Sequence, residues 1–305
     1  MVIPRYPLNS QSPVVLYSPE VMEVKRQIII FWLNQTPNLE QGLSNKTIMK
    51  ISEVYFAPDD FAELVWSTEG LMLCLANIFS DANQYIIEPN MDVRTFELLM
   101  EALTIFEWVA LDIRTKISLV CSPFLHSLYP FLMTNYNLPF YCCIKNRILT
   151  MFNMILMTPF NIIIHFCIDS GFMDTVALNM ASYRRDTTII CVNIMFRFLR
   201  HPKALNFVCS TSITLTRIVG ALNDTINGME LHYPDFKDAI VLEPLHNIIM
   251  CYALISTNIF GRYFLKKYLP EALRAFTFYT YLSKNPATLD LLVRLLENFD
   301  TLPIA

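Results

Sequence analysis

The residue types that most often perform chemistry are present in this sequence, but their spacing matches no catalytic or metal-binding arrangement. The five histidines lie at positions 126, 165, 201, 232 and 246, and none forms a recognisable metal-binding frame with another histidine or with a cysteine. Cys142 and Cys143 are adjacent, so on a helix their side chains diverge by about 100° and cannot face one ligand. The pair Asp59 and Asp60 fits a helix cap better than acid–base work. We therefore expect no enzymatic activity, no metal and no cofactor.

The densest group of basic residues is a second candidate site. It has two interpretations, a solvated helix face with its adjoining loop, or a patch for RNA or an acidic partner. The formal net charge of −4 at pH 7 excludes a strongly basic nucleic-acid binder, but it does not exclude a local patch. The group comprises Arg184, Arg185, Arg197, Arg200 and Lys203.

The composition predicts a helical protein with a large core. Apolar residues make up 54% of the 305 residues and charged residues only 16%, which excludes an intrinsically disordered chain. The mean hydropathy is +0.38. Only 6 glycines are present, whereas β-sandwich, Rossmann and P-loop folds need glycine in turns and phosphate-binding loops. The 8 cysteines lie mostly in apolar runs without a C-x-x-C pair, so we expect reduced, buried core residues of a cytosolic or nuclear protein.

One uncharged stretch is long enough to cross a bilayer. Residues 148–168 form a run of 21 positions without a charged side chain. Thr158 and Pro159 lie at its centre, and proline disfavours a helix that continues through its own position. We interpret the stretch as two helices that meet at a turn. A membrane-associated helical protein remains the less favoured alternative.

The helix signals predict a single all-α domain. Residues 1–17 hold three prolines and predict an extended arm, and residues 227–238 are polar and predict an exposed loop insertion. The expected helices after the arm fall into short-short-long groups of about 40 residues, which is typical of armadillo-like repeats. We therefore expect one armadillo-repeat domain over residues 18–299. The expected helices are 18–33, 39–54, 61–79, 91–111, 114–121, 123–135, 140–157, 160–169, 172–181, 186–200, 202–208, 212–226, 239–257, 259–268, 270–281 and 287–298.

A series of short motifs carries a resemblance to a known family. The motifs, in chain order, are Ala62 with Trp66 and Gly70, then Leu128-Tyr129-Pro130-Phe131-Leu132, Pro139-Phe140, Phe207-Val208-Cys209, Cys251-Tyr252 and Leu269-Pro270. This series resembles the Rcd-one (required for cell differentiation, or Caf-forty) family over about residues 60–298. The pentapeptide is the most specific motif, and the low overall similarity identifies a divergent member.

The resemblance implies a crescent of about six armadillo repeats. It further implies a non-enzymatic adaptor in the CCR–NOT deadenylase complex, which acts in mRNA decay, translational repression and RNA-mediated silencing. The implied partners are the NOT scaffold subunit and helical peptide motifs of RNA-binding regulators, with weak nucleic-acid binding and a homodimer as further options and no membrane. The implied location is the cytoplasm, with the nucleus as a second compartment.

The resemblance also assigns three surfaces. The scaffold-docking surface corresponds to Ser67, Glu69 and Leu73, where the family has a histidine, an aromatic and a small residue. The concave peptide groove corresponds to Cys142, Lys145, Leu149 and Ile190. The convex tryptophan pocket corresponds to Ser212, Thr214, Phe260 and Phe264, and we expect it to be lost, because two arginines are absent and Phe264 replaces an alanine. These substitutions leave open an armadillo scaffold outside the complex that binds other protein peptides.

Overall fold

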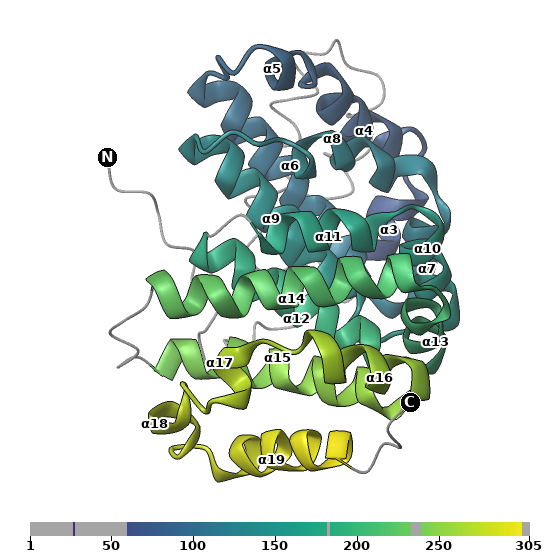
Figure 1. Cartoon of the computed structure of the whole chain (residues 1–305). Coiled ribbons are helices and arrows are strands. Elements are labelled where there is room, and N and C mark those ends of the chain that lie inside the picture. The colour runs from purple at the N-terminus through teal and green to yellow at the C-terminus, as the bar shows by residue number, and fades with distance from the viewer. Residues whose placement is uncertain (1–26, 28–59, 182–183, 233–238, 301–305) are drawn as a thin grey trace, which may run out of the picture.

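The computed structural model describes residue 27 and residues 60–181, 184–232 and 239–300, and within these ranges it contains helices and no strands. The predicted arm (1–17) lies outside the described residues. So do the predicted helices 18–33 and 39–54, apart from residue 27. The described helices form one stack that runs from α4 and α5 at the top of Figure 1 to α19 at the bottom. The first of these are α3 (Phe61–Ser67), α4 (Leu71–Asp81) and α5 (Gln84–Ile87).

Three rows of helices build the rest of the stack, in the short-short-long order that the sequence predicts. The long row, in which each helix packs against the next, consists of α6 (Val93–Leu111), α9 (Pro139–Ile155), α12 (Arg185–Leu199), α15 (Ala239–Thr257) and α19 (Pro286–Asp300). The short row consists of α7 (Ile113–Cys121), α10 (Asn161–Asp169), α13 (Pro202–Ser210) and α16 (Ile259–Tyr268). The third row consists of η2 (Pro123–Leu128), α8 (Tyr129–Leu132), α11 (Phe172–Met180), α14 (Ser212–His232), α17 (Glu271–Arg274) and α18 (Tyr279–Leu282).

Neighbouring helices of the long row are joined by side-chain hydrogen bonds as well as by apolar packing. Each of the four helix pairs has at least one such link between side chains that are at least half-buried. The links are Arg147 Nε to Glu107 Oε1 at 2.8 Å, Thr187 Oγ1 to Asn146 Oδ1 at 2.6 Å, Asn247 Nδ2 to Asn193 Oδ1 at 2.7 Å, and His246 Nδ1 with Thr288 Oγ1 at 2.6 Å.

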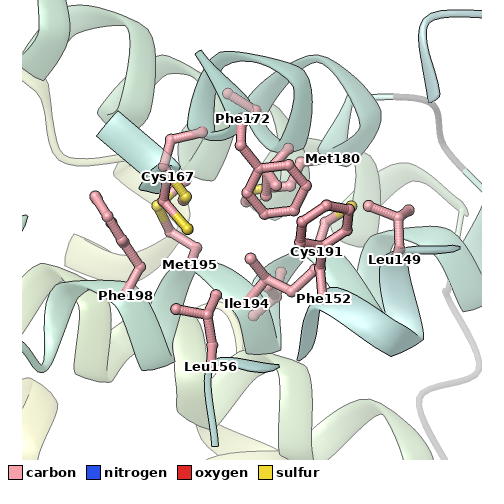
Figure 2. Close-up of a cluster of buried hydrophobic side chains, with 14 of the residues drawn as sticks. Leu149, Phe152, Leu156, Cys167, Phe172, Met180, Cys191, Ile194, Met195 and Phe198 are labelled. Atoms are coloured by element: carbon pink, nitrogen blue, oxygen red, sulfur yellow. The ribbon is translucent and has the colours of Figure 1, made fainter. Parts of the chain in front are cut away.

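A continuous apolar core runs between the rows. At its centre, the rings of Phe152 in α9 and Phe172 in α11 stack with centroids 4.1 Å apart, and Figure 2 shows them side by side. Tyr129 stacks against both rings, at 6.2 Å and 6.3 Å. Because Tyr129 belongs to the pentapeptide that carried the resemblance, this motif reports the packing of the core.

The predicted helices are confirmed in most places and divided in three. The predicted helix 61–79 is interrupted at Gly70, which has a φ of 74° and begins α4. A residue in the left-handed backbone conformation changes the direction of the chain between two helices. Glycine adopts this conformation without strain, because it has no Cβ. The segment 123–135 is a 3₁₀ helix followed by α8, and the segment 270–281 is divided between α17 and α18 by Phe276, whose φ is 53°.

The predicted loop at 227–238 begins later than expected. Helix α14 continues to His232, because Met229 is buried, with 5% of its surface exposed, and the helix gains from covering it. The remainder of the predicted loop, residues 233–238, lies outside the described residues.

The uncharged stretch 148–168 is two helices, as predicted. Helix α9 ends at Ile155 and α10 begins at Asn161. No single described helix is long and apolar enough to span a bilayer. Two bent pairs pass the same criteria of length and composition together, Asn161–Asp169 with Phe172–Met180 at 72° and Pro202–Ser210 with Ser212–Met229 at 107°.

Candidate protein-binding surfaces

The predicted peptide groove falls mainly on α9, where its side chains are buried. Leu149 has 0% exposed surface, and Cys142 and Lys145 have 8% and 9%. Their spacing of three and four residues places them on one face of the helix, which faces the interior. The Cys142 thiol donates to the backbone carbonyl of Tyr136 over 3.6 Å. These three side chains are buried and offer little surface to a peptide, and their assignment to the groove stays a prediction.

A segment of the chain itself takes up the polar groups that were expected to bind a ligand. The Lys145 ammonium donates to the carbonyl of Thr134, and Arg184 donates to the Asn137 carbonyl at 2.9 Å and to its side-chain oxygen at 3.3 Å. Burial lowers the pKa of Lys145, because the charged form loses its hydration, and the carbonyl replaces part of that loss. Residues 134–137 are thus held by side chains from α9 and from the start of α12.

Ile190 is the predicted groove residue that keeps part of its surface accessible. It lies in α12, is half-buried and packs against the core. One turn earlier, Thr187 bonds to Asn146 of α9 and fixes the spacing of the two helices. Any contact that Ile190 makes with a peptide therefore uses only the exposed part of its side chain.

The predicted scaffold-docking residues are all on the surface. Ser67 ends α3, Glu69 lies in the turn, and Leu73 is in the first turn of α4. All three are exposed, and Leu73 exposes 55% of its surface. The turn at Gly70 joins α3 to α4, and we call the exposed positions Ser67, Glu69 and Leu73 the α3–α4 surface. This surface offers one apolar side chain beside a carboxylate and a hydroxyl.

The predicted convex pocket lies between α14 and α16, which pack against each other. Ser212 is exposed at the start of α14, and Phe260 exposes 43% of its surface. Thr214 Oγ1 is 2.9 Å from Thr211 Oγ1. The ring of Phe264 packs against the core, with its centroid 4.5 Å from that of Tyr268.

The predicted basic patch divides into two groups. Arg184 and Arg185 are at the start of α12, whereas Arg197, Arg200 and Lys203 are at its end and at the start of α13. Fifteen helical residues separate the two ends by roughly 22 Å. The five basic residues therefore form two groups rather than one compact cluster, and ligand binding by either group stays a prediction. In the second group, Arg200 lies over the ring of Phe196 at 5.6 Å.

The described residues contain no group of three or more His, Cys, Asp or Glu side chains placed to hold a metal ion. No disulfide joins any of the eight cysteines. Five are buried, but Cys121 is exposed and Cys74 and Cys143 are half-buried, which corrects the expectation of a uniformly buried set. Burial raises the pKa of Cys167 to about 12 and that of Cys209 to about 11. Such thiols are poor nucleophiles, because the reactive thiolate is scarce.

One further buried charge, that of Lys116 in α7, was not predicted from the sequence. Only 4% of Lys116 is exposed, and its ammonium donates to Thr158 Oγ1 at 2.9 Å and to the Met154 carbonyl at 3.4 Å. Burial lowers its pKa. Lys116 therefore ties α7 to the turn between α9 and α10, and a lone lysine in a short helix has no sequence signal that distinguishes it from a solvated one.

Comparison with known proteins now decides the family. The family model described as "Cell differentiation family, Rcd1-like" matches residues 32–299. The chain belongs to this family. The Rcd1-like assignment confirms the resemblance seen in the motifs.

Relatives of this Rcd1-like chain are distant. Cell differentiation protein rcd1 of Schizosaccharomyces pombe is 22% identical over 278 residues, which are 91% of this chain and 95% of that protein. Protein CAF40 of Saccharomyces cerevisiae is 22% identical over 224 residues, which are 72% of this chain and 57% of that protein. Among solved structures, a designed armadillo repeat protein is similar with a TM-score of 0.57 and 14% identity, over 89% of this chain and 98% of that one. This likeness confirms the predicted all-α, armadillo-like fold.

Proposed function

We propose that this Rcd1-like protein is a non-enzymatic adaptor of a CCR–NOT-type complex for mRNA deadenylation and translational repression. The observation that carries the proposal is the family match over residues 32–299. The stacked repeats support it, because they present long surfaces to protein partners. Its place of action is the cytoplasm, with the nucleus as a second compartment.

The α3–α4 surface is the docking site for the NOT scaffold subunit in this proposal. Leu73 is its apolar anchor, because burying such a side chain against a partner gives about 1.5–3 kcal/mol. Ser67 and Glu69 flank it with polar groups. Docking therefore depends on one apolar contact with a polar rim, an arrangement typical of protein interfaces.

A helical peptide motif of an RNA-binding regulator is the second proposed partner. Ile190, in a helix of the long row, is the residue that contacts this peptide. The other groove residues, Cys142, Lys145 and Leu149, are buried. Nucleic acid is a weaker candidate, because the basic residues divide between the two ends of α12.

A second candidate function is an armadillo scaffold outside that complex. Exposed Ser67 and Glu69 favour it, because they stand where the family resemblance places a histidine and an aromatic residue. Two polar side chains there weaken any apolar docking surface.

Affinity purification of the tagged full chain, followed by mass spectrometry, separates the two functions. We expect the NOT scaffold to co-purify with the wild type and to be lost with Leu73→Glu. The matched control is Ile259→Glu on α16, a residue 69% exposed at the other end of the stack, which should keep the scaffold. Absence of the scaffold from all three samples would place the protein outside the complex. Retention by Leu73→Glu would move docking to another surface.

A further inference from the structure

Thr158 lies in a part of the chain that is accessible to a modifying enzyme. Residues 157–162 are all exposed, and Thr158 lies in the break between α9 and α10 rather than in a helix. Exposed breaks between elements are where enzymes gain access to a folded chain. Pro159 follows Thr158, and protein kinases of the proline-directed class require a proline directly after the serine or threonine that they modify.

Ser122 is the other residue of the described ranges that precedes a proline in this way. It is half-buried, and its hydroxyl donates to the Leu119 carbonyl at 2.6 Å and accepts from the Phe124 amide at 3.4 Å. These bonds hold the Ser122 oxygen against the backbone, so we expect it to react poorly. Three further Ser-Pro or Thr-Pro pairs lie outside the described residues, and they begin at Ser12, Ser18 and Thr36.

A buried cation already contacts the hydroxyl of Thr158. The Lys116 ammonium donates to Thr158 Oγ1 at 2.9 Å, although only 4% of the Lys116 surface is exposed. Its second hydrogen bond, to the Met154 carbonyl, is longer at 3.4 Å. Neither of these acceptors carries a charge. A negative group on Thr158 would therefore give this ammonium a partner of opposite sign at hydrogen-bond distance.

The carboxylate that lies one turn before Lys116 is already neutralised by another cation. This carboxylate belongs to Asp112, which precedes α7. Arg114 binds both of its oxygens, with Nε at 3.0 Å from Oδ1 and Nη2 at 2.6 Å from Oδ2. Because most of the Asp112 charge is taken up in this pair, the ammonium of Lys116 can bind a second anion without strong repulsion from Asp112.

We propose that Thr158 is a phosphorylation site for a proline-directed protein kinase and that Lys116 binds the phosphate. The kinase transfers the γ-phosphoryl group of ATP to Thr158 Oγ1. The hydroxyl proton passes to the catalytic base of the kinase, and ADP is the leaving group. The product carries a charge of about −1.5 to −2 at pH 7 and three strong acceptor oxygens. These oxygens replace the neutral hydroxyl as the acceptor for the ammonium.

The phosphate strengthens the connection between α7 and the break between α9 and α10. Helices α7 and α10 pack against each other, on one edge of the stack in Figure 1. A pair of opposite charges that is partly buried is screened only weakly by solvent and salt, so we expect phosphorylation to stabilise this part of the stack. Thr158 and Lys116 lie outside the α3–α4 surface, so this proposal does not rest on scaffold docking.

An activated mitogen-activated protein kinase with Mg-ATP tests the site on the folded full chain. Peptide mass spectrometry should show phosphate on Thr158 and at least tenfold less on Ser122 at the same time point. Thr158→Val should remove this phosphate, whereas the matched control Ser122→Ala should leave it unchanged. A synthetic peptide of residues 152–166 is the unfolded reference. The proposal is overturned if Thr158 of the folded chain stays unmodified, whether or not the peptide reacts, or if Ser122 reacts faster.

Phosphothreonine incorporated genetically in place of Thr158 tests the role of Lys116. We expect the melting temperature to rise by at least about 2 °C. The second pKa of the phosphate, read by ³¹P NMR titration, should fall below its ordinary value of about 6, because the ammonium favours the dianion. Lys116→Met should abolish both changes. The matched control Lys284→Met, at an exposed position between α18 and α19, should keep them.

The phosphate titration in the wild-type background does not depend on a variant that removes a buried lysine. It therefore decides the question even if Lys116→Met unfolds. A second pKa of 6 or above would show that Lys116 does not bind the phosphate and would overturn this part of the proposal. Equal changes in Lys116→Met and Lys284→Met would overturn it as well. Co-purification of the NOT scaffold is measured separately, through Leu73→Glu.

Discussion

Lys145 of α9 donates a hydrogen bond to the backbone carbonyl of Thr134, eleven residues earlier in the chain. Both residues are buried, with 9% and 5% of their surface exposed. The family resemblance assigns Lys145 to a peptide groove. In the structure its ammonium group instead holds the segment between α8 and α9 in place. The contact explains why the Lys145 side chain is not available to a ligand.

Replacing Lys145 by methionine should destabilise the fold. Methionine keeps most of the volume but leaves the Thr134 carbonyl buried without its donor, which costs about 1–3 kcal/mol in the free energy of unfolding. Urea unfolding measures the change. Lys203→Met, at an exposed position, is the control and should stay within about 0.5 kcal/mol of the wild type. Equal effects of the two variants would contradict the role assigned to Lys145.

Gly261 should not tolerate a larger side chain. A Cβ at this position in α16 would lie 2.3 Å from the Ile255 carbonyl oxygen and 3.2 Å from Cys209 Sγ. Gly261→Ala should therefore lower the free energy of unfolding by about 1–3 kcal/mol. Gly220→Ala in α14 is the matched control, because the Cβ that alanine adds there has no neighbouring atom within 4 Å. This variant should raise the free energy of unfolding by about 0.5–1 kcal/mol. A neutral Gly261→Ala would show that α15 and α16 are packed less closely.

A peptide rich in Gly-Trp should not bind between α14 and α16. The Phe264 ring already packs against Tyr268, and the arginines that the family resemblance places beside the indole are absent. Calorimetry with the wild type should show no binding up to about 100 μM. Micromolar binding that Phe264→Asp abolishes, with the fold intact, would show that the pocket survives.

Cys121 should be the first cysteine to react with a thiol reagent. It is exposed at the end of α7, whereas Cys167, Cys191 and Cys251 are buried and burial raises the pKa of their thiols. Iodoacetamide labelling of the native chain, read by peptide mass spectrometry, should modify Cys121 fastest. Cys121→Ser should remove the fast phase, and rapid labelling of Cys191 in the native chain would contradict its burial.

Stability should fall as the pH rises above about 9. The pKa of Cys167 is about 12 and that of Cys209 about 11 in the folded chain, against 9.0 as the ordinary value. Between these limits the unfolded chain binds fewer protons than the folded one, so the free energy of unfolding decreases, by up to about 1 kcal/mol per pH unit for each thiol.

Two buried lysines oppose this fall in the free energy of unfolding. The test therefore compares how steeply that free energy changes with pH in the wild type and in a variant. Burial lowers the pKa of Lys116 and Lys145, and their contribution to stability rises with pH below about 10.5, the ordinary value. Urea unfolding at pH 8, 9 and 10, with reductant, should show a shallower fall for Cys167→Ala than for the wild type. Parallel slopes would mean that Cys167 titrates normally in the folded chain.

The fold could be predicted from the sequence because its signals are local. Asp92 shows this at the start of α6, where its carboxylate accepts from the Thr95 amide at 2.7 Å, as a helix cap should. Pro159 likewise marks the break between α9 and α10. The breaks at Gly70 and Phe276 were missed, because positive φ values there depend on how the flanking helices pack.

The candidate site was less predictable, because burial is a property of the assembled stack. The resemblance placed Leu149 and Ile190 in one groove, but only the rotation of α9 and α12 against their neighbours determines that Leu149 is covered and Ile190 is half-open. Sequence spacing put Arg184 beside Arg200 in one basic group, and the length of α12 separates them. The exposed positions Ser67, Glu69 and Leu73 were placed correctly on the surface, since they flank a turn.

The polar links along the long row determine the order in which its helices can stack. All five helices contribute side chains to one apolar core, and apolar packing alone distinguishes weakly between the right neighbour and a wrong one. A misplaced α15 would bring Asn247 opposite an apolar side chain instead of Asn193 and would leave a buried amide unbonded, at about 1–3 kcal/mol. Thr288 would lose His246 in the same way if α19 docked elsewhere. The links therefore penalise arrangements in which a helix of the long row packs against the wrong neighbour.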